Sequence, residues 1–262
     1  MDGIEKRGIV IQVRDRELLR ELSVLRVADR EQAKAAAGFR STTRVNVRLL
    51  ALTRAGLLRR FFLGAKGTGR KALYALSAKG AELVHVPFRG PRRRTDETLV
   101  ADFFIEHQLT VNRLYCSLKF SPIPVAGVTF LGWKSFDEPI TPSLRLIPDG
   151  YVALEAPAGP LSAFIEVDLG HESLRVWKEK VRQYLQLALS GEFEREAAGF
   201  RFRIAVLAHS ERRMHSIRSL AASFTEKLFW FTSLDQVEAK GFFGPIWLRP
   251  RSDEAKGFIQ TP

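Results

Sequence analysis

Residues 144–187 read LRLIPDGYVALEAPAGPLSAFIEVDLGHESLRVWKEKVRQYLQL, and this stretch decides the fold of the second half of the chain. Its pattern predicts a strand that ends at Asp149, a turn over residues 156–160, a buried strand over residues 163–167 and then an amphipathic helix. Three carboxylates are therefore expected at or near strand ends, namely those of Asp149, Glu166 and Asp168.

The strand that contains Glu166 is apolar enough to be covered on both faces. Side chains alternate along a strand, so Glu166 and Asp168 share one face. An unpaired buried charge costs several kcal/mol or more, so a shared cation or a basic partner is the simplest way to accommodate the pair. A hard divalent metal meets that requirement.

Composition limits the other possibilities. The chain has 262 residues, 45% of them hydrophobic, which suits one large or two ordinary domains with a substantial core. It contains no run of 18 apolar residues and no apolar stretch typical of a signal peptide, so we expect a cytoplasmic protein without membrane contact. The single cysteine excludes an internal disulfide and a cysteine zinc cluster, and the five scattered histidines argue against a histidine metal site.

The formal net charge of +12 is confined to the front of the chain. Of the 41 Lys and Arg residues, 22 lie in the first 100 positions, together with only 10 of the 29 Asp and Glu residues. A region with this bias is expected to bind a polyanion, most commonly a nucleic acid.

The front region shows a regular series of short elements. We predict an amphipathic helix from Arg16, a helix over 30–37 capped by Asp29, and a third helix over 44–55 capped by residues 41–43. A hairpin over 56–76 and a closing helix from Ser77 follow. This order, with a Leu-Leu pair at the helix exit, a basic hairpin and a Tyr-x-Leu-Ser-x-x-Gly sequence, resembles the winged helix-turn-helix family.

The resemblance implies that the third helix enters the major groove of double-stranded DNA. Its candidate DNA-contacting residues are Arg40, Ser41, Thr42, Arg44, Asn46 and Arg48. The hairpin would contact backbone phosphates through Lys66, Arg70 and Lys71. In the competing interpretation, the domain only docks other proteins, and its charges form a solvated face.

The predicted domains are a winged helix-turn-helix over residues 15–86, a basic linker over 87–95 and an α/β domain over 96–250 with a mixed sheet. Two prolines and three consecutive arginines mark the linker. Its arginines either follow the DNA backbone or form a solvated hinge. The helix expected over 96–120 contains Glu106 and His107 in its middle.

The second half resembles the PD-(D/E)XK nuclease superfamily, which has a restriction-endonuclease-like fold. Its motif matches Pro148-Asp149 and Glu166-Val167-Asp168, with Glu166 17 positions after Asp149. The whole chain, from the winged helix through Glu106-His107 and the two motifs to Lys180-x-x-x-Tyr184, resembles the plasmid replication-relaxation family.

The superfamily resemblance implies a site for Mg²⁺ or Mn²⁺ whose ligands are Asp149, Glu166 and the carbonyl of Val167. Oxygen ligands suit Mg²⁺, which keeps several waters and lowers the pKa of one of them. Glu106 would add a carboxylate from the preceding helix, and His107 would orient a ligand or phosphate. Alternatively, His107 has only a structural role in the helix.

The sequence departs from the superfamily pattern at the lysine position, which is occupied by Asp168. A carboxylate cannot stabilise negative charge on phosphorus. In some relatives the lysine moves to the following helix, so Lys180 or Lys178, and less favourably Arg175, would take its place. Otherwise the lysines are solvated and the site does not cleave DNA.

Two function classes follow. The first is a metal-dependent endonuclease that nicks and so relaxes the DNA of a plasmid or mobile element. The second is a non-catalytic DNA-binding protein, either a replication accessory factor or a repressor, with a degenerate nuclease fold. A homodimer and contacts with replication or mobilisation proteins are compatible with both. A metabolic enzyme is disfavoured because nucleotide-binding and hydrolase motifs are lacking.

Overall fold

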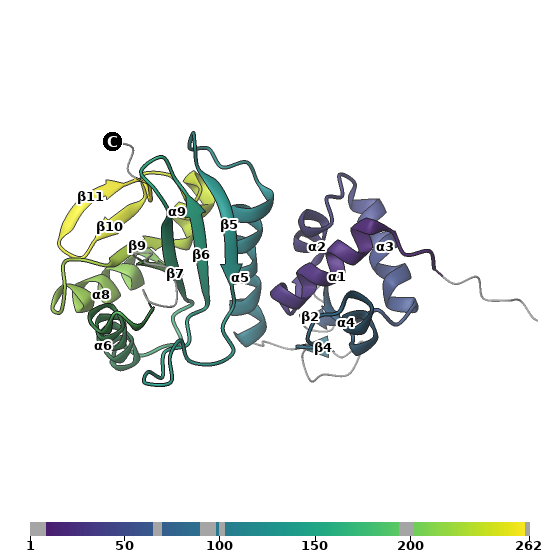
Figure 1. The fold of residues 1–262 in the computed structure, drawn as a ribbon, viewed down its shortest axis with the longest axis horizontal. Helices are drawn as coiled ribbons and strands as arrows, with labels where there is room; N and C mark the ends of the chain where they lie inside the picture. Colours follow the sequence, from purple (N-terminus) through teal and green to yellow (C-terminus); the bar gives the residue numbers. More distant parts are fainter. Residues whose placement is uncertain (1–8, 65–69, 90–97, 100–102, 194–201, 260–262) are drawn as a thin grey trace, which may run out of the picture. The chain divides into compact units, whose positions relative to one another are not determined.

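The computed structural model describes residues 9–64, 70–89, 98–99, 103–193 and 202–259. The chain divides into two compact units, Met1–Phe120 and Ser121–Pro262. Figure 1 labels helices and strands of both units. Among the described helices, none combines the length and the apolar composition that crossing a lipid bilayer would require.

The described part of the first unit contains a small sheet and five helices. Its elements in chain order are α1 (Val13–Leu25), β1 (Ala28–Asp29), α2 (Arg30–Ala36), α3 (Thr42–Arg54), β2 (Leu58–Leu63), β3 (Lys71–Leu76), α4 (Ala78–Val84), β4 (Thr98–Leu99) and α5 (Phe103–Phe120). The strand order is β1-β3-β2-β4. Strands β2 and β3 form the predicted antiparallel hairpin.

Side-chain caps begin three of these helices where the sequence predicts a start. Asp29 accepts a hydrogen bond from the Gln32 amide at the start of α2. Ser41 caps α3 in the same way, and Ser77 caps α4. Each cap satisfies an amide that has no partner within the helix. The helical periodicity is also confirmed, because Leu18, Leu19, Leu22 and Leu25 of α1 are all buried.

Helix α5 packs within the first unit, which differs from the predicted boundary. The Gln32 side chain donates to the Leu109 carbonyl at 2.8 Å, and Asn112 donates to the carbonyls of Leu25 and Val27 at 3.0 and 2.6 Å. We predicted that residues 96–120 belong to the second domain. These buried hydrogen bonds place the described part of that segment with the front of the chain, and the boundary between the two units follows Phe120. The predicted linker lies largely outside the described residues.

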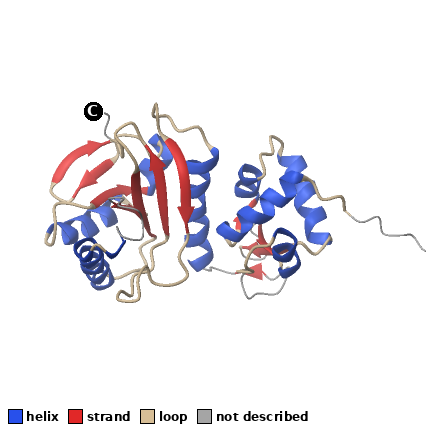
Figure 2. Ribbon diagram, in the orientation of Figure 1, coloured by secondary structure: helices blue, strands red, loops and turns tan. Residues whose placement is uncertain are grey.

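The second unit is built on one mixed sheet. Its elements are β5 (Thr129–Lys134), β6 (Gly150–Glu155), β7 (Leu161–Asp168), α6 (Leu174–Ser190), β8 (Phe202–Ala208), α8 (Glu211–Ala222), β9 (Phe229–Ser233), α9 (Leu234–Lys240), β10 (Trp247–Arg249) and β11 (Ser252–Lys256). The strand order is β11-β10-β9-β8-β7-β6-β5, and β7, β8 and β9 run parallel. Figure 2 shows the strands in red and the helices in blue. The predicted mixed sheet is therefore confirmed.

The prediction of a strand that ends at Asp149 is wrong. Residues 144–149 form a loop, and β6 begins at Gly150, so Asp149 precedes a strand instead of closing one. Pro148 has no amide hydrogen to donate to a ladder, which disfavours a strand across it. Gly150 is required where β6 begins, because a Cβ there would overlap the indole ring of Trp133.

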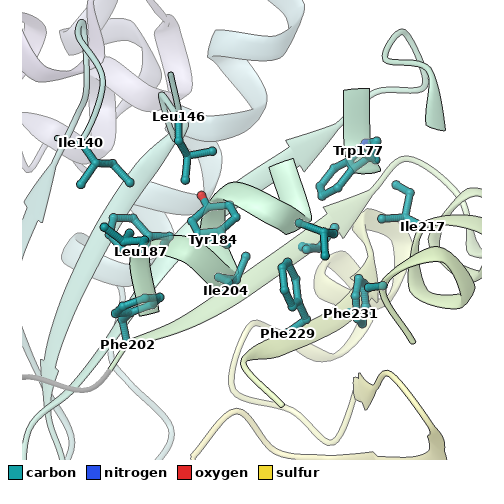
Figure 3. Packing of buried hydrophobic residues seen from close by; sticks show 14 of the residues in the cluster. Ile140, Leu146, Trp177, Tyr184, Leu187, Phe202, Ile204, Ile217, Phe229 and Phe231 are labelled. Atoms are coloured by element: carbon teal, nitrogen blue, oxygen red, sulfur yellow. The ribbon is translucent and has the colours of Figure 1, made fainter. Parts of the chain in front are cut away.

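The main core of the second unit lies between the sheet and helices α6 and α8. Figure 3 shows Trp177, Tyr184 and Leu187 of α6 in one cluster with side chains of β8 and β9 such as Ile204 and Phe229. These five side chains are fully buried. The cluster fixes α6 against β7, which positions the polar residues described next.

Candidate functional site

The antiparallel pairing of β6 and β7 brings Asp149 beside the end of β7. Gly150 pairs with Ile165, so the residue before Gly150 lies next to the segment that follows Ile165. The Val167 amide donates to Asp149 Oδ2 at 2.7 Å, and the Asp149 amide donates to the Ile165 carbonyl at 3.2 Å. The two predicted motifs thus meet at one point of the sheet, although Asp149 directly precedes strand β6 and does not end a strand.

Glu166 is fully buried and contacts two polar side chains of α6. Its Oε2 accepts from Lys180 Nζ at 2.8 Å, and its Oε1 accepts from the Tyr184 hydroxyl at 2.5 Å. Lys180 and Tyr184 are four residues apart and therefore share one helix face. Of the two lysines proposed from the sequence, Lys180 is the one that reaches Glu166, whereas Lys178 is exposed.

Lys180 lies between two carboxylates. Its Nζ is 2.8 Å from Glu166 Oε2 and 2.9 Å from Glu172 Oε2, and its side chain is 19% exposed. The carboxylate of Asp149 also acts electrostatically on both Glu166 and Lys180. Three carboxylates therefore share one ammonium group in this cluster.

The cluster strongly affects proton binding. Burial raises the pKa of Glu166 to about 7; Lys180 opposes this rise and Asp149 adds to it. Burial alone would lower the pKa of Lys180, but Glu166, Asp149 and Glu172 raise it above its usual value. Burial and the neighbouring Glu166 both raise the pKa of Tyr184. Near neutral pH, Lys180 is thus an ammonium and Glu166 can exchange a proton.

Asp168 belongs to a separate set of contacts. Its two oxygens accept from Arg213 at 2.9 and 2.8 Å, and the Trp177 indole donates to Oδ2 at 2.6 Å. The Gly170 amide donates to Oδ1 at 2.7 Å. Burial would raise the pKa of Asp168, but the hydrogen bonds from Arg213 and Trp177 outweigh it and lower that pKa. A carboxylate that accepts four hydrogen bonds is suited to holding Arg213, Trp177 and Gly170 in place.

Three other residues predicted for this site belong to α5 and to the start of α6. Glu106 and His107 are on α5, which belongs to the first unit. Arg175 is exposed in the first turn of α6. Their predicted roles stay predictions.

The described residues contain no group of three or more His, Cys, Asp and Glu side chains arranged to hold a metal ion. The predicted ligand set has two carboxylates and a backbone carbonyl, so it requires fewer such side chains. Mg²⁺ is commonly held by one or two carboxylates together with waters and substrate phosphates. A site of that kind remains compatible with Asp149 and Glu166.

The predicted DNA-contacting residues of the first unit differ in exposure. Arg40, Arg44 and Asn46 are exposed on and before α3, and Thr42 is half-buried. Ser41 caps the helix. Arg70 is exposed, Lys71 forms an ion pair with Asp29 at 2.5 Å, and Lys66 lies outside the described residues.

Arg48 has internal partners. Its guanidinium donates to both carboxylate oxygens of the fully buried Asp15, with Nε 2.6 Å from Oδ1, and to the Val10 carbonyl at 2.6 Å. The hydrogen bond with Asp15 is the main cause that raises the pKa of Arg48. These contacts tie α3 to α1, so we leave Arg48 out of the proposed DNA-contacting set.

Sequence reasoning missed two residues that shape the site. Trp177 precedes Lys180 by three residues, and this helical spacing could have placed its indole beside the ammonium. Arg213 is the other residue that the sequence did not predict for this site. No local signal connects it to Asp168, because the two are 45 residues apart and meet only through the β7–β8 pairing.

Comparisons with known proteins identify the family. No curated protein matches the sequence significantly. The chain is similar to the solved structure of the restriction endonuclease FokI, with a TM-score of 0.32 and 11% identity, over 87% of this chain and 43% of that one. The chain therefore spans less than half of the FokI chain. A family model described as replication-relaxation matches residues 19–202, which supports a DNA-related function. The chain belongs to the replication-relaxation family.

Proposed function

We propose that this protein binds double-stranded DNA of a plasmid or other mobile element and that its second unit nicks this DNA with a divalent metal. The observation that carries the proposal is the position of Lys180 Nζ, 2.8 Å from Glu166 Oε2 in a cluster that also includes Asp149. Asp149 directly precedes β6, Glu166 lies within β7, and Lys180 belongs to the following helix, α6. We interpret this arrangement as a PD-(D/E)XK nuclease site whose lysine has moved to the helix.

The donor set fits Mg²⁺ or Mn²⁺. Asp149 and Glu166 offer carboxylate oxygens, and the Val167 carbonyl is the third proposed ligand. Each carboxylate oxygen can accept more than one contact, so the bonds from Lys180 and Tyr184 leave capacity on Glu166. Three carboxylates around one ammonium also leave an excess of negative charge that a divalent cation would offset.

Hydrolysis of a phosphodiester forms a bond between a water oxygen and phosphorus and breaks a bond from phosphorus to a sugar oxygen, which leaves with a proton. A bound Mg²⁺ would lower the pKa of the attacking water and offset charge on the phosphate. The Lys180 ammonium would donate to the attacking oxygen or to a phosphate oxygen as negative charge develops. Tyr184 and Glu172 would hold Glu166 and Lys180 in position.

The first unit would supply DNA binding as a winged helix-turn-helix. In this proposal α3 is the recognition helix and the β2–β3 hairpin is the wing. The exposed side chains of Arg40, Arg44 and Asn46 support this role, as does the excess of basic residues in the first 100 positions. Thr42 at the start of α3 and Arg70 of the hairpin would add further contacts with the DNA.

A plasmid assay tests the nicking proposal. Purified protein with Mg²⁺ or Mn²⁺ is expected to convert supercoiled plasmid to open circles. Asp149→Ala and Glu166→Gln should lose this conversion, whereas Glu155→Gln should retain it, because Glu155 is exposed at the opposite end of β6. Equal conversion by all four proteins would reject the proposed site.

One observation favours a non-catalytic alternative. Both oxygens of Glu166 already accept hydrogen bonds within the protein, as a purely structural carboxylate would. The protein would then be a replication accessory factor or repressor whose second unit docks a second copy or replication and mobilisation proteins. In that case plasmid stays supercoiled, and sequence-preferring DNA binding survives both EDTA and the carboxylate substitutions.

A further inference from the structure

Trp177 contacts a carboxylate of β7 and an ammonium group of α6. Its indole N–H donates to Asp168 Oδ2 at 2.6 Å, while Lys180 Nζ lies 5.1 Å from the centre of its ring system. The side chain is fully buried in the core of the second unit. Trp177 is therefore a physical link between the Asp168–Arg213 contacts and the Glu166–Lys180 ion pair.

The link follows from matched spacings on the strand and the helix. Glu166 and Asp168 are two residues apart and share one face of β7. On α6, Trp177 and Lys180 are three residues apart and are neighbours on the helix surface. The strand residues thus meet the helix residues in register: Asp168 contacts Trp177, and Glu166 contacts Lys180.

Asp168 restrains the indole. It is itself held by two hydrogen bonds from Arg213 and one from the Gly170 amide. Arg213 also donates to the Glu172 carbonyl, so the segment that carries Glu172 is fixed by the same guanidinium. A cation within about 6 Å of an indole face is attracted to it. With the ring held, the ammonium has a fixed surface on one side and two carboxylates within 3 Å.

We propose that Asp168 is a positioning residue: through Trp177 it holds the Lys180 ammonium against Glu166. The catalytic consequence rests on the proposed nuclease function. The positional claim concerns only these side chains. It also accounts for a carboxylate at the motif position where lysine is expected. In this proposal, Asp168 fixes the position of Lys180, which takes the place of the missing motif lysine.

Amine labelling tests the positional claim without requiring activity. The intact protein is treated briefly at one pH, well below its melting temperature, with an amine-acylating reagent, and labelling is quantified by mass spectrometry. Lys178, exposed on the same helix, is the internal reference. Trp177→Phe removes the indole N–H and keeps a buried ring, and Asp168→Asn removes the charge. Each should raise the Lys180-to-Lys178 labelling ratio about threefold or more.

A melting curve for each variant separates this effect from unfolding. An unchanged labelling ratio in folded Trp177→Phe protein would overturn the inference, even if Asp168→Asn failed to fold. Where wild-type protein nicks plasmid, Trp177→Phe should lower kcat more than it raises KM, and an equal kcat would count against positioning. Where wild-type protein does not nick, the proposed function fails, while the labelling ratio still decides the role of Asp168.

Discussion

Lys180 reaches Glu166 across 14 residues of chain, with its Nζ 2.8 Å from Oε2. The contact joins a strand residue to a helix residue and depends on the packing of α6 on the sheet. A lysine can therefore meet the strand glutamate when the strand itself carries Asp168. This geometry gives Lys180 a role that can be separated from that of its exposed neighbours.

We expect Lys180→Met to abolish nicking and to destabilise the second unit. The substitution keeps the length of the side chain but leaves the fully buried Glu166 without its ammonium. Removing one partner of a buried pair costs about 3 kcal/mol or more. All four tryptophans lie in the second unit, so urea unfolding followed by tryptophan fluorescence measures this loss. Lys178→Met is the matched control and should stay within about 0.5 kcal/mol of wild type.

Glu166 should make the stability of the second unit depend on pH. Its pKa is about 7 in the folded protein and 4.5 as the reference value for an unperturbed glutamate. A raised carboxyl pKa means that the protonated form favours folding, so this contribution is complete below pH 4.5 and is lost as pH rises through 7. The shift corresponds to about 3 kcal/mol.

Urea unfolding at pH 4.5 and pH 8 checks this dependence. Between pH 4.5 and pH 8, wild type should lose about 3 kcal/mol of unfolding free energy relative to Glu166→Gln, because the glutamine has no proton to release. Glu179→Gln on the exposed side of α6 is the control and should leave the pH profile unchanged. Parallel profiles for wild type and Glu166→Gln would contradict the assignment.

Tyr184→Phe should destabilise the protein although its ring packing is preserved. The hydroxyl donates to Glu166 at 2.5 Å with both groups fully buried, so its loss leaves a carboxylate oxygen with one donor fewer. The expected cost is about 1–3 kcal/mol at pH 8. Tyr151→Phe is a suitable comparison, because Tyr151 is half-buried and bonds to Ser162, and it should cost less. Equal costs would indicate that the bond to Glu166 adds nothing.

Local patterns in the sequence were enough to predict most of the elements. Capping residues such as Asp29 and Ser41 act within one helical turn, so their effect can be read from adjacent positions. The buried strand with Glu166 follows from its apolar run, and the hairpin from its turn residues. Likewise, Lys180 and Tyr184 are four residues apart, a helical spacing that places them on one face, and both contact Glu166.

Features that depend on distant contacts could not be predicted in the same way. Phe103 begins α5 but is 55% exposed, because hydrophobic periodicity does not reveal which turns of a helix are covered. The final strand β11 is polar and pairs only at the sheet edge. The internal roles of Arg48 and Asp168 depend on partners 33 and 45 residues away.

Arg44 and Arg48 should give opposite results when each is changed to alanine. Arg44 is exposed on α3, so Arg44→Ala should weaken DNA binding with little change in stability. Arg48→Ala leaves the fully buried Asp15 without its partner and should cost on the order of 3 kcal/mol in unfolding free energy. Circular dichroism melting and gel-shift titration of both variants check this. Loss of DNA affinity in fully folded Arg48→Ala protein would restore Arg48 to the DNA-contacting set.

Divalent cations should stabilise the second unit through Asp149 and Glu166. A ligand that binds only the folded state raises stability by RT ln(1 + [L]/Kd), so Mg²⁺ or Mn²⁺ at about 100 times its Kd would add about 2.7 kcal/mol. Two changes should remove most of this gain: Asp149→Ala, which deletes a proposed ligand, and Glu166→Gln, which neutralises one. Glu155→Gln should keep it, because that carboxylate lies at the far end of β6. The same melting shift in all variants would place the cation elsewhere and would disconnect any nicking activity from this cluster.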